Sequence, residues 1–274
     1  MNASELTFGI EIETTVPASY SVGGYHSTEQ AAGLPAGWKA TSDSSIRASR
    51  GRRGCEFVSP VLKGADGVRQ VIEVARQLNA MGAKVNESCG FHIHVGFDVT
   101  NRVALDRLVK LVGHFETAIF ASTGTKRRER SNWCRGLRQH ASQANATSQA
   151  SQMRYHVLNL TNLMQGRKPT VEFRAFAGTL NIVKILGYVR MCLALVERAC
   201  DTRIAADFQP KASYPTTDRK GGPGQSALCR LFYQIGWTKG RVKRTFGDLG
   251  ADGPSLDSIK KELRRLAKQY DAEV

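Results

Sequence analysis

Long apolar runs and closely spaced cysteines are both missing from this chain of 274 residues. The most apolar stretch, Ile185 to Val196, is interrupted by Arg190, so no segment reaches the roughly 18 apolar residues of a membrane span. The first residues contain no basic stretch followed by an apolar one, so no secretory signal is predicted. The six cysteines are scattered without a C-x-x-C pair, which is typical of reduced thiols. These absences predict a cytoplasmic protein without a membrane partner.

Acidic residues are few beside basic ones. The 39 lysines and arginines outnumber the 24 aspartates and glutamates, which gives a formal net charge of +15. This excess favours anionic partners such as nucleotide phosphates, nucleic acid or an acidic peptide, although the same charge can serve solubility alone. A Gly-rich phosphate loop of the G-x-x-x-x-G-K-[ST] type is also missing, so nucleotide binding has to come from other elements.

Three strand-like segments carry apolar side chains on one face and ionisable ones on the other. Residues 7–16, 90–97 and 170–176 alternate with the period of two that is typical of a half-buried strand. The face opposite the apolar one carries Glu11, Glu13, His92, His94, Glu172 and Arg174. These six side chains converge on a single surface when the three strands are neighbours in one sheet.

The residue types on that surface indicate a metal–nucleotide complex. Carboxylates two residues apart on one strand face repel each other and raise each other's pKa, and a divalent cation between them removes the repulsion. Carboxylate oxygens suit Mg²⁺, and an imidazole extends the choice to Mn²⁺. An arginine in the same cluster can bind a phosphate oxygen. Each of the three motifs alone is more typical of a solvated or structural strand face.

Helices with an apolar face are interspersed with the strands. Their predicted starts are Asp66, the residue after Thr100, Asn181, Ser226 and Ser255. Two further strand-like segments, 38–41 and 55–62, are joined by a polar stretch whose basic, Gly-rich part (48–54) predicts a mobile tip. This order, hairpin-like near the N-terminus and mixed afterwards, indicates an α+β fold.

Two polar segments interrupt the pattern. Residues 122–154 are basic at first and low in complexity later, which predicts a long exposed loop. Residues 207–225 are rich in Pro, Gly, Lys and Asp and predict a linker. We therefore expect a main domain over 1–206 and a small basic helical region over 226–274, whose charged face could bind nucleic acid or an acidic protein.

The ordered motifs FGIEIE, SDSSI, CEFVSPVL, CGFHIHV and VEFRAF closely resemble the amidoligase family of the carboxylate–amine ligase superfamily, to which glutamine synthetase and glutamate–cysteine ligase belong. The segments RSNWC (130–134) and YHVLN (155–159) resemble family motifs as well, with Trp133 in place of a tyrosine. The resemblance covers most of residues 6–200. It implies a mainly antiparallel sheet curved into a funnel and backed by helices, the glutamine synthetase-like catalytic fold, with ATP and Mg²⁺ or Mn²⁺ on its concave face.

The resemblance also implies roles for single residues. The implied metal ligands are Glu11, Glu13, Glu56, His92 and Glu172. Contacts to the nucleotide are implied for Arg174, His94 and Asn159. The implied catalytic residues are Arg174, which stabilises the transferred phosphoryl group, and Asp43 and Glu56, which hold the amine or take its proton.

The predicted activity is an ATP-dependent ligation of a carboxylate to an amine through an acyl phosphate, with an amino acid, a peptide or a protein as substrates. Because an acyl phosphate must be shielded from water, we expect segments 48–54 and 122–154 to close over the site. Two other functions stay open: a catalytically silent sheet that binds nucleic acid or peptide through its basic surface, and a metal-dependent amide hydrolase. A silent scaffold predicts decay of the motif acids, and these are all intact.

Overall fold

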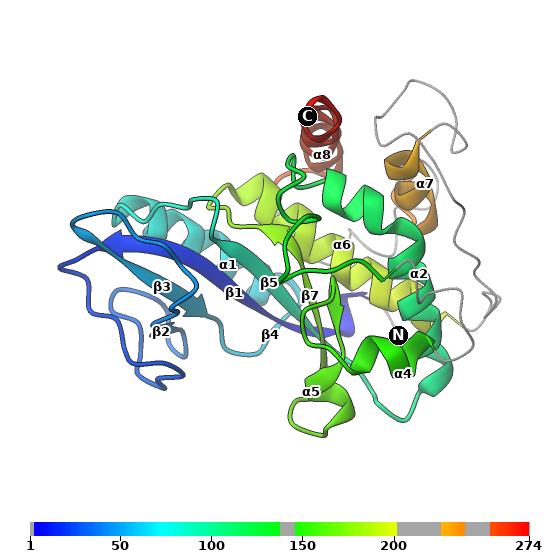
Figure 1. Cartoon of the computed structure of the whole chain (residues 1–274), viewed down its shortest axis with the longest axis horizontal. Coiled ribbons are helices and arrows are strands. Elements are labelled where there is room, and N and C mark those ends of the chain that lie inside the picture. Colours follow the sequence, from blue (N-terminus) through cyan, green and yellow to red (C-terminus); the bar gives the residue numbers. More distant parts are fainter. Residues whose placement is uncertain (1–2, 138–145, 202–225, 239–252, 274) are drawn as a thin grey trace.

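The computed structural model describes residues 3–137, 146–201, 226–238 and 253–273. Its centre is an open sheet in the order β2-β3-β1-β5-β7-β6, with β4 paired to β1, and each strand pair is antiparallel (Figure 1). The strands are β1 (Thr7–Pro17), β2 (Lys39–Thr41), β3 (Arg52–Val58), β4 (Leu62–Lys63), β5 (Gly90–Gly96), β6 (Leu158–Asn159) and β7 (Thr170–Ala177). The predicted α+β class and mainly antiparallel sheet are confirmed.

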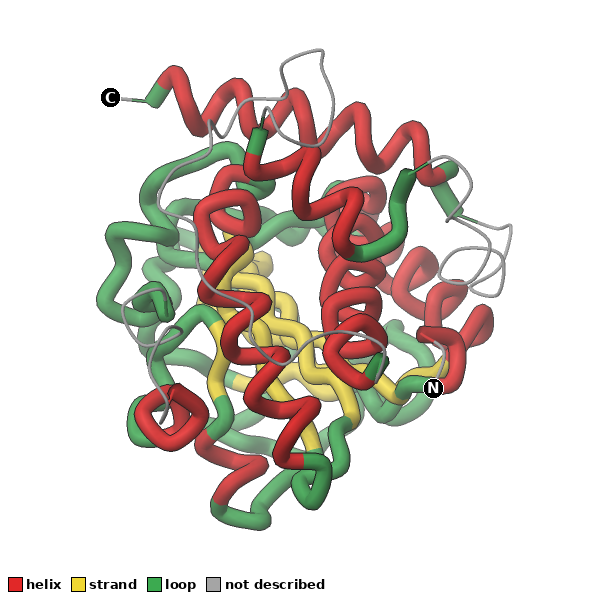
Figure 2. The backbone as a smooth tube through the Cα atoms, turned by 90° about the vertical axis from the view of Figure 1, so that its right-hand side faces the viewer, coloured by secondary structure: helices red, strands yellow, loops and turns green. Residues whose placement is uncertain are grey.

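Helices back the sheet and form much of the rest of the molecule. In Figure 2, seen from the right-hand side of Figure 1, they lie in front of the strands. They are η1 (Ala3–Glu5), α1 (Gly64–Ala80), α2 (Arg102–Ala121), α4 (Ala146–Ser151), α5 (Thr161–Met164), α6 (Ile182–Cys200), α7 (Ala227–Gln234) and α8 (Leu256–Ala272). Among the described residues, no helix combines the length and apolar character needed to cross a membrane.

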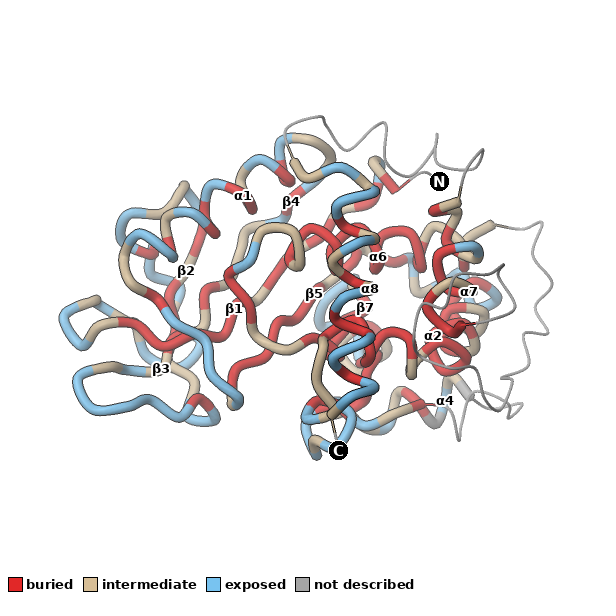
Figure 3. Tube along the Cα trace, turned by 90° about the horizontal axis from the view of Figure 1, so that it is seen from above, coloured by how far each residue is buried: buried red, intermediate tan, exposed pale blue. Residues whose placement is uncertain are grey.

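The apolar faces of the strands form the core. Phe8, Ile10 and Ile12 of β1 are buried together with apolar residues of β5, β7, α1 and α6. From α6, Tyr188 stacks on Phe176 of β7 with ring centroids 4.3 Å apart. Figure 3 shows the buried residues following the strands and the helices packed on them. One sheet face is thereby fixed against the helices, and the alternation sends the ionisable residues to the other face.

The predicted helix starts are close to the observed ones. The side chains of Asn181 and Ser255 accept hydrogen bonds from the backbone N–H groups of Lys184 and Ser258 and cap α6 and α8. Helix α1 differs slightly, because it begins at Gly64 and carries Asp66 in its first turn.

The prediction of a long exposed loop over 122–154 is partly wrong for the described residues: 122–137 contain no helix or strand, but several of these residues are buried. Ser122, Arg128, Cys134 and Leu137 are buried, and α4 lies within the predicted loop. Residues 138–145 lie outside the described part of the chain. The polar composition of this segment gives no sign of these few separated residues, each of which is buried by elements distant in the sequence.

The predicted mobile tip over 48–54 is also partly wrong. Its last three residues, 52–54, open β3 and pair with the end of β1. The Arg52 guanidinium donates to the carbonyl oxygens of Thr15 and Gly82, the second at 2.8 Å. Strand pairing with β1 therefore orders residues whose local composition is typical of a turn.

The two C-terminal helices share the apolar core of the sheet domain. Helix α7 packs on α2, and α8 packs on both α2 and α6. Leu231 of α7 and Ile259 and Leu263 of α8 are buried in the same cluster as the strand residues. The predicted linker over 207–225 lies outside the described residues.

Truncation of Leu263 tests this shared core. We expect Leu263→Ala to lower the free energy of unfolding of the whole protein by about 2–5 kcal/mol, because a cavity opens where α8 meets α6. Chemical denaturation followed by circular dichroism measures the change, and Lys268→Ala on the exposed face of α8 is the matched control. A separate early transition of α8, with the main transition unmoved, would contradict a shared core.

Candidate functional site

A cavity of about 1030 Å³ lies over the ionisable face of the sheet. Its floor comes from β1, β3, β5 and β7, and its walls come from segments that follow β2, α2 and α4. Every site residue predicted from the sequence lines it: Glu11, Glu13, Asp43, Glu56, His92, His94, Asn159, Glu172 and Arg174. The expected convergence on one surface is confirmed.

Strand register brings these side chains together in pairs. Glu11 of β1 lies opposite His92 of β5, and Glu13 lies opposite Glu56 of β3. The register shifts between Phe91 and Ile93, so β7 carries an irregularity where it passes this part of β5. Residues directly opposite on an antiparallel pair share a face and lie within contact distance. The antiparallel pairing of neighbouring strands is therefore what builds the cluster.

Glu11 contacts both histidines of β5. Its Oε2 lies 3.2 Å from Nδ1 of His92, and its Oε1 lies 2.9 Å from Nε2 of His94. Burial alone would raise the pKa of Glu11, but His94 and His92 outweigh it and hold that pKa well below its usual value. The pKa of His94 is raised in turn, because Glu11 outweighs the effect of burial. The charged forms of carboxylate and imidazole thus stabilise each other.

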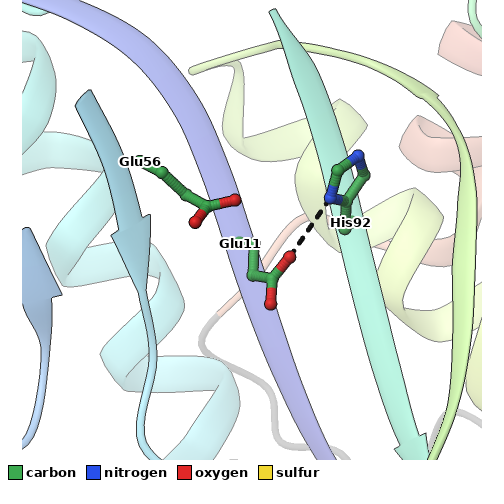
Figure 4. A group of neighbouring side chains, drawn as sticks. All are labelled: Glu11, Glu56 and His92. Atoms are coloured by element: carbon green, nitrogen blue, oxygen red, sulfur yellow. Dashed lines mark hydrogen bonds and ion pairs between the residues drawn. The ribbon is translucent and has the colours of Figure 1, made fainter. Parts of the chain in front are cut away.

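The charged form of Glu56 is not stabilised by a neighbouring cation in this way. Burial and the negative charges of Glu11 and Glu13 raise its pKa to about 9. Among the described residues it forms no ion pair, and its hydrogen-bond contact is the Thr41 hydroxyl at 3.5 Å. Figure 4 shows Glu56, Glu11 and His92 projecting from neighbouring strands toward one another. The cluster holds more carboxylates than its own cations neutralise.

The donor set fits a divalent cation. Ligand atoms of Glu11, Glu56 and His92 lie within 4.8 Å of one another. The same limit holds for a second group, Glu13 with Asp43 and Glu56, and for a third, Glu11 with His94 and Glu172. Carboxylate oxygens joined by an imidazole are ligands that Mg²⁺ and Mn²⁺ accept. Two of the groups share Glu11 and two share Glu56, so the three groups form one continuous set of candidate ligands.

The β7 side of the cavity is built around Glu172. Its Oε1 pairs with Arg174 on the same strand, and its Oε2 accepts a hydrogen bond from Asn159 Nδ2 at 2.6 Å. Burial raises the pKa of Glu172, but His94 and Arg174 outweigh it and lower that pKa overall. The guanidinium of Arg174 thus lines the cavity beside a charged carboxylate, and its contact with phosphate stays a prediction.

Several cavity residues were missed at the level of the sequence. Arg128 reaches the cavity from the segment after α2 and is buried, although its basic run predicted an exposed lid. Trp133 also lines the cavity and meets Tyr155 edge-on at 5.0 Å between ring centroids. Arg167 and Lys168 add exposed positive charge at the approach to β7. Trp133 and Tyr155 lie in RSNWC and YHVLN, so the resemblance of these segments to family motifs is the signal that could have found the aromatic pair.

Comparisons with known proteins bear on the fold and the family. Residues 4–152 and 136–196 match the family model described as "Putative amidoligase enzyme". No curated protein sequence gives a significant match.

Among solved structures, the chain is similar to a bifunctional glutathione synthetase from Pasteurella multocida, with a TM-score of 0.44 and 11% identity over 98% of this chain and 52% of that one. It is also similar to a novel glutamine synthase homolog, with a TM-score of 0.44 and 12% identity over 98% of this chain and 67% of that one. A third similar structure is GmaS without ligand, with a TM-score of 0.41 and 13% identity over 98% and 70%. The chain spans about half the length of the first of these proteins.

Cation binding is expected to release a proton from Glu56. Near neutral pH the raised pKa of about 9 keeps this carboxyl group protonated, and only its deprotonated form binds a metal. Titration with Mn²⁺ in buffers of different ionisation enthalpy should report release of about one proton, and the affinity should rise with pH toward 9.

Glu56→Gln should abolish this release, whereas Glu73→Gln on the exposed face of α1 should leave it unchanged. Mn²⁺ binding of the wild type without proton release, or with an affinity independent of pH, would contradict the account of Glu56.

Proposed function

Since the chain belongs to the amidoligase family, we propose that it is an ATP-dependent ligase that joins a carboxylate to an amine. The observation that carries the proposal is the cavity itself. It combines clustered carboxylates and imidazoles suited to divalent cations with buried guanidinium groups suited to phosphate. Its volume of about 1030 Å³ is at the upper end of the range for small-molecule sites, which leaves room for a nucleotide beside a second substrate.

The residues proposed to hold Mg²⁺ or Mn²⁺ are Glu11, Glu13, Glu56, His92 and Glu172. Such ions, when bound, neutralise the charge of the β- and γ-phosphate oxygens. In the structure Glu172 forms an ion pair with Arg174. If Glu172 held a cation instead, the Arg174 guanidinium would be available to a phosphate oxygen. His94 and Asn159 complete the proposed contacts to the nucleotide.

The chemistry follows from the poor leaving group of a carboxylate. The carboxylate oxygen of one substrate attacks the γ-phosphorus of ATP, the bond from that phosphorus to the bridging oxygen breaks, and ADP departs. The product is an acyl phosphate, whose carbonyl carbon an amine then attacks while inorganic phosphate leaves. Arg174 stabilises the negative charge on the transferred phosphoryl group. The net reaction joins carboxylate and amine and converts ATP to ADP and phosphate.

Asp43 and Glu56 are the groups proposed to receive the amine. They lie beside each other at the β2–β3 side of the cavity, where Asp43, and Glu56 once cation binding has released its proton, attract an ammonium group. The amine must lose a proton to become a nucleophile and another after it attacks, and a carboxylate within reach can accept it. The substrates are an amino acid, a peptide or a protein that supplies these two groups.

Two alternatives make different predictions. A metal-dependent amide hydrolase would use the same carboxylates and imidazoles but would not consume ATP. A catalytically silent sheet would not turn over ATP with any pool of amines and carboxylates. Among the described residues, no observation supports a nucleic-acid partner of the basic C-terminal region.

Amine-dependent release of ADP is the decisive assay. With pools of carboxylates and amines, Mg²⁺ and ATP, we expect ADP release together with an amide product detected by mass spectrometry. Glu11→Gln and Arg174→Ala should each lower turnover by about 100-fold or more, because the first removes a ligand of the proposed cation and the second removes a counterion of the transferring phosphoryl group. Arg69→Gln, on the exposed surface of α1, is the matched control and should keep full turnover. Full activity of either site variant, or amide cleavage that needs no ATP, would contradict the proposed function.

A further inference from the structure

A second guanidinium, that of Arg128, forms part of the cavity wall. Arg128 lies between α2 and α4, outside the sheet, and only 7% of its surface is exposed. It lines the same cavity as the carboxylate cluster. Its side chain reaches the start of β5, where a Cβ atom added to Gly90 would lie 3.2 Å from its Nη2. The absence of a side chain at Gly90 thus lets this guanidinium approach the strand.

Within the described part of the chain, Arg128 has no carboxylate counterion. Its Nη2 donates to the main-chain oxygen of Arg174 at 2.6 Å, and its buried Nε has no hydrogen-bond partner. Among the described residues no carboxylate lies within ion-pair distance of it, whereas Arg174 is paired with Glu172. A buried charge without a partner is costly unless a ligand supplies the opposite charge. Arg128 is therefore a buried guanidinium in the cavity wall that an anion can neutralise.

The C-terminal end of α8 holds the segment that carries Arg128. The two carboxylate oxygens of Glu273 accept hydrogen bonds from the backbone N–H of Lys126 at 2.9 Å and from the Thr125 hydroxyl at 3.2 Å. On the other side of Arg128, the Tyr270 hydroxyl donates to Glu129. Residues on both sides of Arg128 thereby contact one helix end, through the backbone of Lys126 and through the side chain of Glu129.

We propose that Arg128 binds a phosphate oxygen of the nucleotide and that α8 positions it through Glu273 and Tyr270. A planar guanidinium binds phosphate through parallel hydrogen bonds, which suits a ligand beside metal-bound carboxylates. The proposal rests on the ATP-dependent activity proposed above. It extends the site beyond the residues that match the family model, which end at residue 196, to a helix at 256–272.

Arg130 is the natural control for Arg128. It is the arginine within the motif RSNWC, yet it is exposed and does not line the cavity. The two residues lie in the same segment and carry the same positive charge, but they differ in burial and in access to the cavity. If nucleotide affinity depended on total charge alone, substitution of either arginine would lower it equally.

The first test measures binding of Mg-ATP and Mg-ADP by calorimetry, without a carboxylate substrate. We expect Arg128→Gln to weaken nucleotide binding by about tenfold or more, because a charge-assisted hydrogen bond is lost, and Arg128→Lys to fall between it and the wild type. Arg130→Gln should stay close to wild type. Thermal unfolding identifies a variant that has lost its fold, in which case Arg128→Lys decides.

Each outcome of this test has a clear meaning. If Arg128→Gln and Arg128→Lys both bind nucleotide with wild-type affinity, the proposal is overturned. This holds even if turnover falls, because the anion bound by Arg128 would then be the substrate carboxylate. A wild type that binds Mg-ADP but whose Arg128 variants bind equally well would overturn only this proposal. A wild type that binds no nucleotide would overturn the proposed function as well.

The second test is a double-mutant cycle between α8 and the cavity. Glu273→Ala should weaken Mg-ATP binding several-fold in the wild type and leave it unchanged in the Arg128→Gln background, because Glu273 acts through Arg128. Glu262→Ala, on the same helix and paired with Arg265, is the matched control and should have no effect in either background. Equal losses from Glu273→Ala in both backgrounds, or no loss in either, would overturn the positioning role of α8.

Discussion

Mutual repulsion among carboxylates on one face of a sheet is the constraint around which this molecule is arranged. The register of β1 with β3 and β5 sets Glu11, Glu13 and Glu56 beside one another. The opposite face of the sheet is buried, with Phe8, Ile10 and their neighbours in the core against the helices. This burial holds the strands in that register. A slip of one residue would move every core side chain to the wrong face, so the acids cannot separate without unfolding the sheet.

The protein compensates this repulsion unevenly. His92, His94 and Arg174 stabilise the charged forms of Glu11 and Glu172, while Glu56 is left with a raised pKa. Arg128 presents the complementary imbalance, because it is a buried cation for which the described residues supply no carboxylate partner. A metal-bound phosphate ligand carries both kinds of charge and satisfies both groups at once. The electrostatics of the cavity and the proposed ligase chemistry thus follow from the same uneven compensation.

The sequence predicted what depends on local pattern. Strict alternation identified the strands and the faces that carry Glu11, His92 and Glu172, and capping residues placed the helix starts. Asp43 and Glu56 came from resemblance rather than from pattern, because neither lies on a clearly alternating segment. Arg128 was misjudged because its burial depends on Gly90 and on α8, and such long-range contacts leave no trace in local composition. The same reason explains why residues 52–54 were expected in a loop rather than in β3.

The most direct test of the central claim is an anomalous-diffraction experiment on crystals grown with Mn²⁺ and a non-hydrolysable ATP analogue. The account predicts anomalous peaks within about 2.0–2.4 Å of carboxylate oxygens of Glu11, Glu13 or Glu56, with the triphosphate on the Arg174 side of the cavity. Crystals in which the nucleotide is bound elsewhere and the cavity carboxylates bind no Mn²⁺ would contradict the account.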